Sequence, residues 1–133
     1  MIKTKSKSSI QKLDKQLWDI FSLYTRQRYA NSYGVVKCFT CSKIDHWKNF
    51  DAGHFITRAK ASTKFDELNV MPQCKSCNIF GQGKQFEFGL ELDRIYGAGT
   101  AESLLFKSKM LCKRDRYDYE NLIEVYKNKL KDL

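Results

Sequence analysis

The stretch NVMPQCKSCN, residues 69–78, contains one of two Cys-x-x-Cys pairs, and the other is the stretch CFTC, residues 38–41. Each pair can offer two thiolates from one tight turn, and two such turns that face each other complete a tetrahedral zinc site. Four thiolates leave no open coordination position, so we expect this Zn²⁺ to be structural rather than catalytic. The predicted ligands are Cys38, Cys41, Cys74 and Cys77.

Disulfides or a redox-active pair are the alternatives to a zinc site. No apolar segment of the kind found in signal peptides follows residues 1–7, and no apolar run is long enough to cross a membrane. We therefore expect a reducing cytoplasm, in which paired cysteines bind metal more often than they form structural disulfides. The fifth cysteine, Cys112, stands alone and is expected to be a buried or idle thiol.

Length and charge narrow the classes of function. The chain has 133 residues, which fits a single domain over residues 1–133 that would gain stability from a bound metal. Its 24 basic and 15 acidic side chains give a net charge of +9. This excess favours a polyanionic partner, most often nucleic acid. The alternative is that the lysines only keep the protein soluble.

The N-terminal part of the chain has a helical pattern. Apolar residues recur at helical spacing from Ile10 to Tyr24, which predicts a helix within residues 10–34. We expect it to end near Ser32–Gly34 and to cover the core. Residues 1–9, rich in lysine and serine, are expected to form a basic arm ahead of it.

The C-terminal part, residues 98–133, is also expected to be helical, with a short helix near residues 100–109 and a longer one to follow. Tyrosines in the longer helix are expected to pack in the core rather than stack on bases. The apolar stripe of that helix consists of Tyr119, Leu122, Ile123, Tyr126, Leu130 and Leu133.

Short elements are expected between these helical regions. The alternation of apolar residues with turn-forming residues predicts two short strands, and glycines interrupt the helical pattern that follows them. The expected elements are a strand at Ala52–Ile56, a connecting loop at residues 57–68, a strand at Asn69–Met71 stopped by Pro72, a helical turn from Ser76, and a helix from Lys84 that stops at Gly97.

The polar residues of this region follow the order His54, Asn69, Asn78, with the last directly after the final cysteine. This order resembles the HNH nucleases, whose core carries a His on the first strand and a His or Asn at the start of the helix. The resemblance implies an α+β fold. It consists of a small ββα-metal core (HNH, or His-Me finger) with a four-cysteine zinc site over residues 35–97, flanked by N- and C-terminal helices.

Two stretches carry a more specific resemblance. AGHFITR, residues 52–58, and FDELNVMPQCKSCN, residues 65–78, together with the downstream pair Glu87-Phe88, resemble the phage NinG/Rap recombination nucleases. The resemblance covers about residues 36–97. It implies a phage or prophage protein that acts in the bacterial host cell on branched DNA, such as Holliday junctions or other recombination intermediates.

The three polar residues suit phosphodiester hydrolysis, which needs an attacking water, a base and charge neutralisation at the leaving oxygen. We predict that His54 is the general base, that Asn78 binds a metal ion through its amide oxygen, and that Asn69 holds the loop that aims His54. The alternative for His54 is an ordinary strand histidine with satisfied hydrogen bonds. His46 lacks such a setting and is expected to lie on the surface.

The catalytic metal, Mg²⁺ or Mn²⁺, requires further oxygen ligands. Many HNH nucleases carry an acidic ligand directly before the His, whereas this chain has Gly53 there. Asp51 lies at an odd separation from His54, so on a regular strand it faces the same side as Gly53 and is a substitute candidate. Glu87, from the following helix, is a second candidate. The alternative for both is an ordinary solvated carboxylate.

Basic residues in the expected loop, Arg58, Lys60 and Lys64, are candidates for phosphate contacts near the cut. A solvated loop would also be rich in lysine, so this alternative stays open. Arg58 is the strongest candidate because a guanidinium can bind phosphate through two hydrogen bonds and the residue matches the family motif.

The leading hypothesis is therefore a metal-dependent DNA endonuclease that acts on branched DNA. Cutting at a junction often uses two active sites, so a homodimer is compatible with it. One alternative is a zinc-stapled DNA-binding module without cleavage activity, which the absence of a ligand at Gly53 would favour. Another is a nonspecific or site-specific HNH nuclease.

Overall fold

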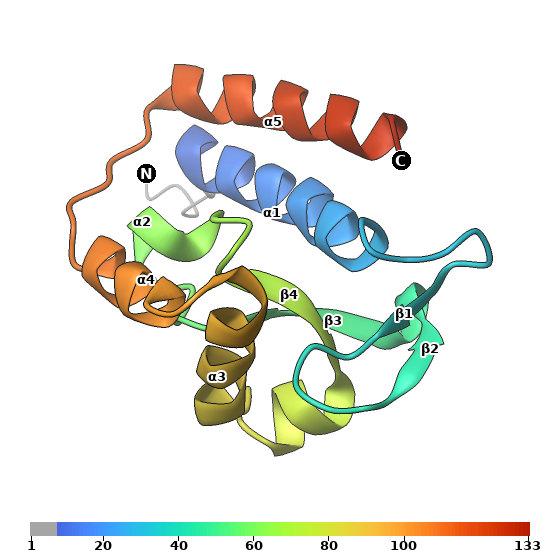
Figure 1. Cartoon of the computed structure of the whole chain (residues 1–133). Coiled ribbons are helices and arrows are strands. Elements are labelled where there is room, and N and C mark those ends of the chain that lie inside the picture. Colours follow the sequence, from blue (N-terminus) through green and yellow to red (C-terminus); the bar gives the residue numbers. More distant parts are fainter. Residues whose placement is uncertain (1–7) are drawn as a thin grey trace, which may run out of the picture.

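The computed structural model describes residues 8–133 and has a mixed α+β architecture, which confirms the coarse fold class (Figure 1). Residues 1–7, most of the predicted basic arm, lie outside the described part. The elements are α1 (Ser9–Gln27), β1 (Val35–Lys37), β2 (Ile44–His46), the 3₁₀ turn η1 (Trp47–Asn49), β3 (Phe50–His54), α2 (Ala61–Lys64), β4 (Val70–Cys74), the π-helical turn η2 (Ser76–Phe80), α3 (Gln85–Tyr96), α4 (Thr100–Ser108) and α5 (Arg116–Lys131).

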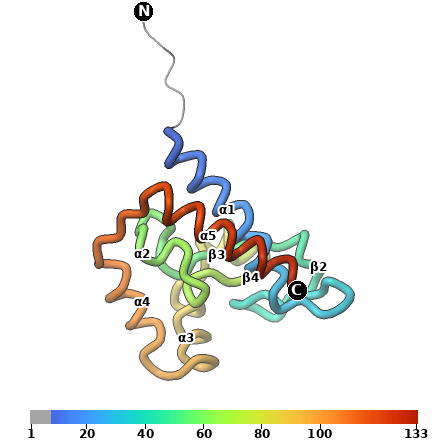
Figure 2. The backbone as a smooth tube through the Cα atoms, turned by 90° about the horizontal axis from the view of Figure 1, so that it is seen from above, coloured from blue at the N-terminus to red at the C-terminus, as the bar shows by residue number. Residues whose placement is uncertain are grey.

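The antiparallel pair β3–β4 lies at the centre of the molecule, between two groups of helices (Figures 1 and 2). Successive side chains of a strand point to opposite faces. Accordingly, Val70 packs with α1 and α5, whereas Met71 packs with α3 and α4. A second antiparallel pair, β1–β2, precedes β3 and carries the first cysteine pair in its turn.

Helix α1 begins with a capping box, in which Ser8 and Gln11 exchange hydrogen bonds between side chain and backbone. It ends at Gln27, earlier than the predicted end near Ser32–Gly34. The reason is local hydrogen bonding that competes with the helix, because the Asn31 side chain accepts bonds from the backbone of the two residues Tyr33 and Val35.

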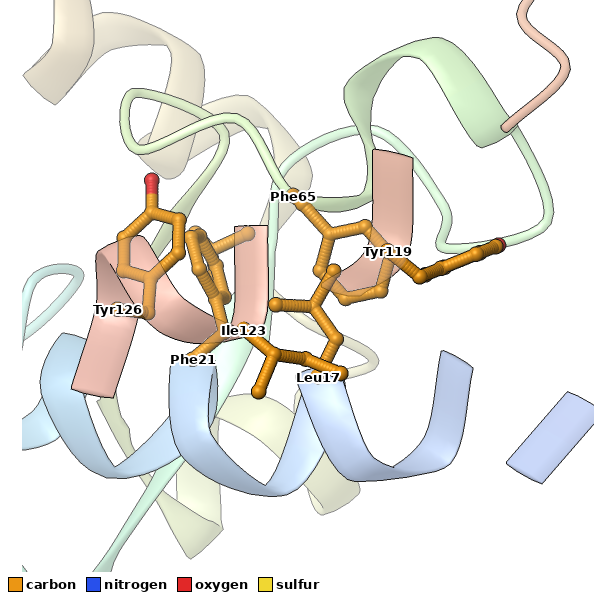
Figure 3. Packing of buried hydrophobic residues seen from close by; sticks show 7 residues of the cluster. Leu17, Phe21, Phe65, Tyr119, Ile123 and Tyr126 are labelled. Atoms are coloured by element: carbon orange, nitrogen blue, oxygen red, sulfur yellow. The ribbon is translucent and has the colours of Figure 1, made fainter. Parts of the chain in front are cut away.

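The main core lies where α1 and α5 pack side by side (Figures 2 and 3). Tyr119 and Tyr126 are buried there, which confirms that these tyrosines pack in the core rather than offer free faces to bases. Their hydroxyl groups donate to Asp14 and Glu67 at 2.8 Å each. The buried residues of this cluster are Leu17, Phe21, Phe65, Val70, Tyr119, Ile123 and Tyr126.

The strands differ from their predicted bounds. Strand β3 covers Phe50–His54, two residues earlier than predicted, and β4 runs through Pro72 instead of stopping there. Phe55 N donates to Asn69 O, so in the alternating antiparallel pattern Pro72 occupies a position without hydrogen bonds to β3. A proline without an N–H is therefore tolerated in this edge strand.

The helical elements after β4 agree with the predictions. A helical turn begins at Ser76, α3 stops at Gly97 with φ +112°, and α4 lies within the expected range. The predicted loop at residues 57–68 contains the short helix α2, which the sequence pattern did not indicate. Within residues 8–133, no helix combines the length and the apolar character needed to cross a membrane.

The α1–α5 core predicts a large effect of Phe21→Ala. The Phe21 ring is fully buried, so its loss should lower the free energy of unfolding by about 3–5 kcal/mol, measured by urea denaturation at a fixed zinc concentration. Phe80, which is 83% exposed, provides the control. Phe80→Ala should change the free energy of unfolding by less than about 0.5 kcal/mol. Equal effects of the two substitutions would contradict this description of the core.

Candidate metal centre and catalytic pocket

The four paired cysteines converge in the structure. Their sulfur atoms all lie within 4.8 Å of one another, and Cys41 Sγ lies 3.7 Å from Cys74 Sγ. A tetrahedral zinc ion with bonds of about 2.3 Å holds its sulfurs about 3.8 Å apart, so the cluster has the size such an ion needs. No other group of three or more His, Cys, Asp or Glu side chains in residues 8–133 has metal-binding geometry. These four cysteines could hold a metal such as zinc.

Backbone N–H groups point at the sulfurs from both turns. Cys74 N donates to Cys38 Sγ at 3.3 Å, and Lys43 N donates to Cys41 Sγ at 3.4 Å. Burial raises the pKa of Cys38, but the hydrogen bonds from Cys74 and Thr40 outweigh it and lower the pKa to about 7. Burial raises the pKa of Cys77 to about 12. A metal ion must therefore displace protons when it binds.

His54 lies at the end of β3 with its ring held on one side by the backbone. His54 Nε2 is 3.0 Å from Lys64 O. A carbonyl oxygen only accepts hydrogen bonds, so the neutral ring carries its proton on Nε2 and its lone pair on Nδ1. The indole of Trp18, from α1, stacks on the ring with centroids 4.9 Å apart and planes tilted by 26°.

His54 and Asn78 line the same hollow, which has a volume of about 400 Å³. Ala52 contributes from the same face of β3, because it lies two residues before His54. The hollow is lined by Trp18, Ala52, His54, Thr57, Arg58, Asn78, Gln82, Gly83 and Gln85.

Asn69 is fully buried and does not line this hollow. Its side-chain oxygen accepts from Ile56 N at 2.7 Å, and its Nδ2 donates to Ile56 O and Thr63 O at 3.0 Å each. The side chain thus ties both ends of the segment that connects β3 to α2. Since Lys64 follows Thr63, the same contacts fix the carbonyl that binds His54.

The acidic candidates occupy different places. Asn78 Nδ2 donates to Asp51 Oδ2 at 3.1 Å, and Lys75 Nζ lies 2.7 Å from Asp51 Oδ1. Asp51 therefore does not line the hollow itself but contacts Asn78, which does. Glu87 lines a separate hollow beside the first cysteine pair, with Lys37 and Glu91 among its neighbours. The structure does not bring Glu87 to His54.

The presence of glycine at position 53 has a steric cause that the sequence did not reveal. A Cβ atom at this position would lie 1.8 Å from Gln73 Oε1, so no side chain fits there. Gln73 is fully buried, and its Nε2 donates to Thr40 Oγ1 and Gly83 O at 2.9 Å each. Gln73 thus occupies the space in which an acidic ligand before the His would lie.

The three basic candidates for phosphate contacts lie in different environments. Arg58 is exposed and lines the hollow, while Lys60 is exposed just before α2. Lys64 is half-buried and forms an ion pair with Asp14, so its ammonium group is already engaged. Of the three, only Arg58 lines the hollow with His54.

Sequence reasoning missed two contributors to the hollow. Trp18 belongs to a helix that was expected mainly to cover the core, and no local signal links it to His54. The segment of Gln82, Gly83 and Lys84 has three consecutive positive φ angles of 55°, 87° and 51°. The two glycines around Gln82 indicated a break in the helix. They did not indicate that this turn lines the hollow.

The family model described as "Bacteriophage Lambda NinG protein" matches residues 1–133. The chain belongs to the NinG family. It is 28% identical over 123 residues to "Protein ninG" of Escherichia phage 933W, covering 90% of this chain and 57% of that protein. The match to "Protein ninG" of Salmonella phage P22 has the same identity and covers 56% of that protein. A comparison with solved structures finds no significant match.

The NinG resemblance noted in the sequence is thereby confirmed, and the relation to HNH nucleases remains a prediction. The chain spans somewhat more than half the length of the curated NinG relatives it matches. The hollow and the cysteine cluster both lie within the part that this chain shares with the family model.

The protonation state of His54 in this NinG protein follows from its burial. Burial lowers the pKa of His54 to about 4, the bond to Lys64 O opposes this, and the positive charges of Arg58 and Lys64 add to the lowering. The imidazole is therefore neutral at pH 7, with Nδ1 free to accept a proton.

The cysteine cluster predicts that zinc and stability depend on Cys74. Native mass spectrometry of the purified protein should show one zinc ion per chain, and Cys74→Ser should lose zinc and unfold at lower urea because binding free energy contributes to folding. Cys112 lies outside the cluster, so Cys112→Ser should retain both zinc and stability. A Cys74→Ser protein that folds as well as the wild type without zinc would refute the metal centre.

The lowered pKa of His54 predicts a dependence of stability on pH. The unfolded chain takes up this proton near pH 6.5, whereas the folded protein does so only near pH 4. The free energy of unfolding should therefore fall as the pH drops from 6.5 towards 4, by up to about 1.4 kcal/mol per pH unit.

Because cysteine ligands also take up protons in acid, the informative quantity is the difference between the wild type and His54→Gln. That difference should shrink as the pH falls, and the His54 ring in the wild type should titrate near pH 4 by NMR. A midpoint near 6.5 would contradict the buried, hydrogen-bonded ring.

Proposed function

We propose that this NinG protein is a metal-dependent DNA endonuclease with a ββα-metal core of the HNH class. The strand pair β3–β4 followed by the turn η2 would form that core, with zinc bound by the four cysteines as its structural staple. One observation carries the proposal: His54, with Nδ1 free, and Asn78 line a single hollow with Arg58 at its edge.

His54 supplies the base in this proposal. Its neutral Nδ1 takes a proton from the water that attacks the scissile phosphate. The pKa of about 4 in the free protein makes the ring a weak base. An anionic phosphate bound in the hollow favours the charged form and so raises this pKa towards the working pH. Lys64 O keeps the ring oriented through the proton transfer.

Asp51 and Asn78 are the residues that would hold the catalytic cation. They lie in hydrogen-bond contact and offer carboxylate and amide oxygens, the ligand type that Mg²⁺ or Mn²⁺ prefers. The Lys75 side chain, whose ammonium group pairs with Asp51, is 57% exposed, and such surface pairs contribute only about 0–1 kcal/mol, so a cation can replace the ammonium group. When bound, the cation would neutralise charge on the phosphate and on the leaving oxygen.

DNA is the proposed substrate. The net charge of +9 attracts a polyanion, and Arg58 can bind a phosphate beside His54 through two hydrogen bonds. The preference for branched recombination intermediates, and a homodimer that cuts two strands of a junction, rest on the NinG/Rap resemblance. A DNA-binding module without cleavage and a nonspecific nuclease are the outcomes that the following assay separates.

Cleavage is expected with Mg²⁺ or Mn²⁺ on a four-way junction, and less on linear duplex or single-stranded DNA. His54→Ala should lower the cleavage rate by about 10²–10⁴-fold, because it removes the base, while junction binding persists. The other histidine gives the matched control: His46 caps η1 outside the hollow, so His46→Asn should cleave like the wild type.

The outcomes of this assay distinguish the alternatives. Binding without cleavage of any DNA would indicate the binding module, and equal cleavage of all three would indicate a nonspecific nuclease. If His54→Ala retained full cleavage, His54 would not be the base.

A further inference from the structure

The aromatic side chain of Trp18 makes the N-terminal helix part of the hollow. Its indole stacks on the His54 imidazole with ring centroids 4.9 Å apart and an interplanar angle of 26°. Both rings line the same hollow as Asn78. Helix α1, which carries Trp18, lies outside the β3–β4–η2 unit that supplies His54 and Asn78.

The hydrogen bond to Lys64 does not fix the imidazole completely. A single bond from Nε2 to a carbonyl fixes one atom of the ring, but the ring plane can still turn about that bond. In the described part of the chain, Lys64 O is the only hydrogen-bond partner of the imidazole nitrogens. The direction of the Nδ1 lone pair therefore depends on what packs against the faces of the ring.

Trp18 is itself held firmly. Its indole packs in the aromatic group formed with Phe21 and Phe65, whose ring centroids lie 6.2 and 6.5 Å from it. Phe21 in turn packs edge-on against Tyr126 of α5, at 4.9 Å. The plane of the His54 ring is thus tied through Trp18 to the α1–α5 core.

The stacking of Trp18 on His54 has a second effect, which depends on the charges near the imidazole. Arg58 and Lys64 disfavour a protonated imidazole, and no acidic partner of His54 is found in residues 8–133. An indole face attracts a cation, so the stacked Trp18 stabilises the imidazolium that forms when Nδ1 takes up a proton.

We propose that Trp18 is a positioning residue of this active site, which fixes the plane of the His54 imidazole so that Nδ1 points at the attacking water. This inference rests on the proposed nuclease function. It assigns to α1, through Trp18, a part in catalysis as well as its part in the core.

The test compares three variants at a temperature at which each is folded and contains zinc. Trp18→Leu keeps an apolar side chain but removes the stacking face, so kcat on the DNA substrate should fall about 10–100-fold with KM nearly unchanged. Trp18→Phe restores an aromatic face and should recover most of kcat. Ile123→Val is the control, because Ile123 belongs to the same buried core but makes none of the aromatic contacts of Trp18 or His54, so this change should lower stability but not kcat.

A second readout does not depend on cleavage. In the wild type, NMR should show the His54 ring protons shifted upfield by the indole and one tautomer with the proton on Nε2. Trp18→Leu should remove the upfield shift and let the ring plane vary, which broadens the ring-proton signals, while Lys64 O keeps the proton on Nε2. Trp18→Leu with unchanged kcat and with ring-proton signals as sharp as in the wild type, or Trp18→Phe no better than Trp18→Leu, would overturn the proposal. If the wild type cut no DNA, the proposed function would fail, while the NMR result would still decide whether Trp18 positions the ring.

Discussion

The arrangement of the site depends on the convergence of four cysteine sulfurs from two separate turns. One turn joins β1 to β2, and the other joins the end of β4 to η2, so a metal ion bound there would tie both to the central strand pair. Asn78 directly follows the last cysteine, and its contact with Asp51 brings η2 against β3. The position of Asn78 relative to His54 therefore follows from the geometry of the cysteine cluster.

Hydrogen bonds between uncharged groups then orient the residues at the hollow. Asn69 fixes the backbone that leads to Lys64, and the Lys64 carbonyl fixes the proton of His54 on Nε2. Gln73 links the first cysteine turn to the turn after η2. Asn69 and Gln73 are buried, so breaking one of the hydrogen bonds that they make would cost about 1–3 kcal/mol of desolvation. The result is a neutral imidazole that lines the hollow and is held through Nε2, with Nδ1 free to accept a proton.

The sequence predicted those features that depend on local pattern. Cysteine spacing indicated the metal cluster, and helical periodicity located the terminal helices, because both signals act over a few neighbouring residues. Long-range packing decided what the sequence did not show. Pro72 stays within β4 because its nitrogen faces away from β3, and Gly53 is required by the amide of Gln73. Likewise, the approach of Trp18 to His54 and the separation of Glu87 from it depend on how helices dock, which no spacing rule encodes.

X-ray absorption spectroscopy at the zinc edge of the purified protein tests the central claim most directly, because it reports the ligands of the bound ion without any substitution. The account predicts one zinc ion with four sulfur neighbours at about 2.3 Å and no oxygen or nitrogen in its first shell. A spectrum with mixed oxygen or nitrogen ligands, or a folded protein that contains no metal, would contradict it.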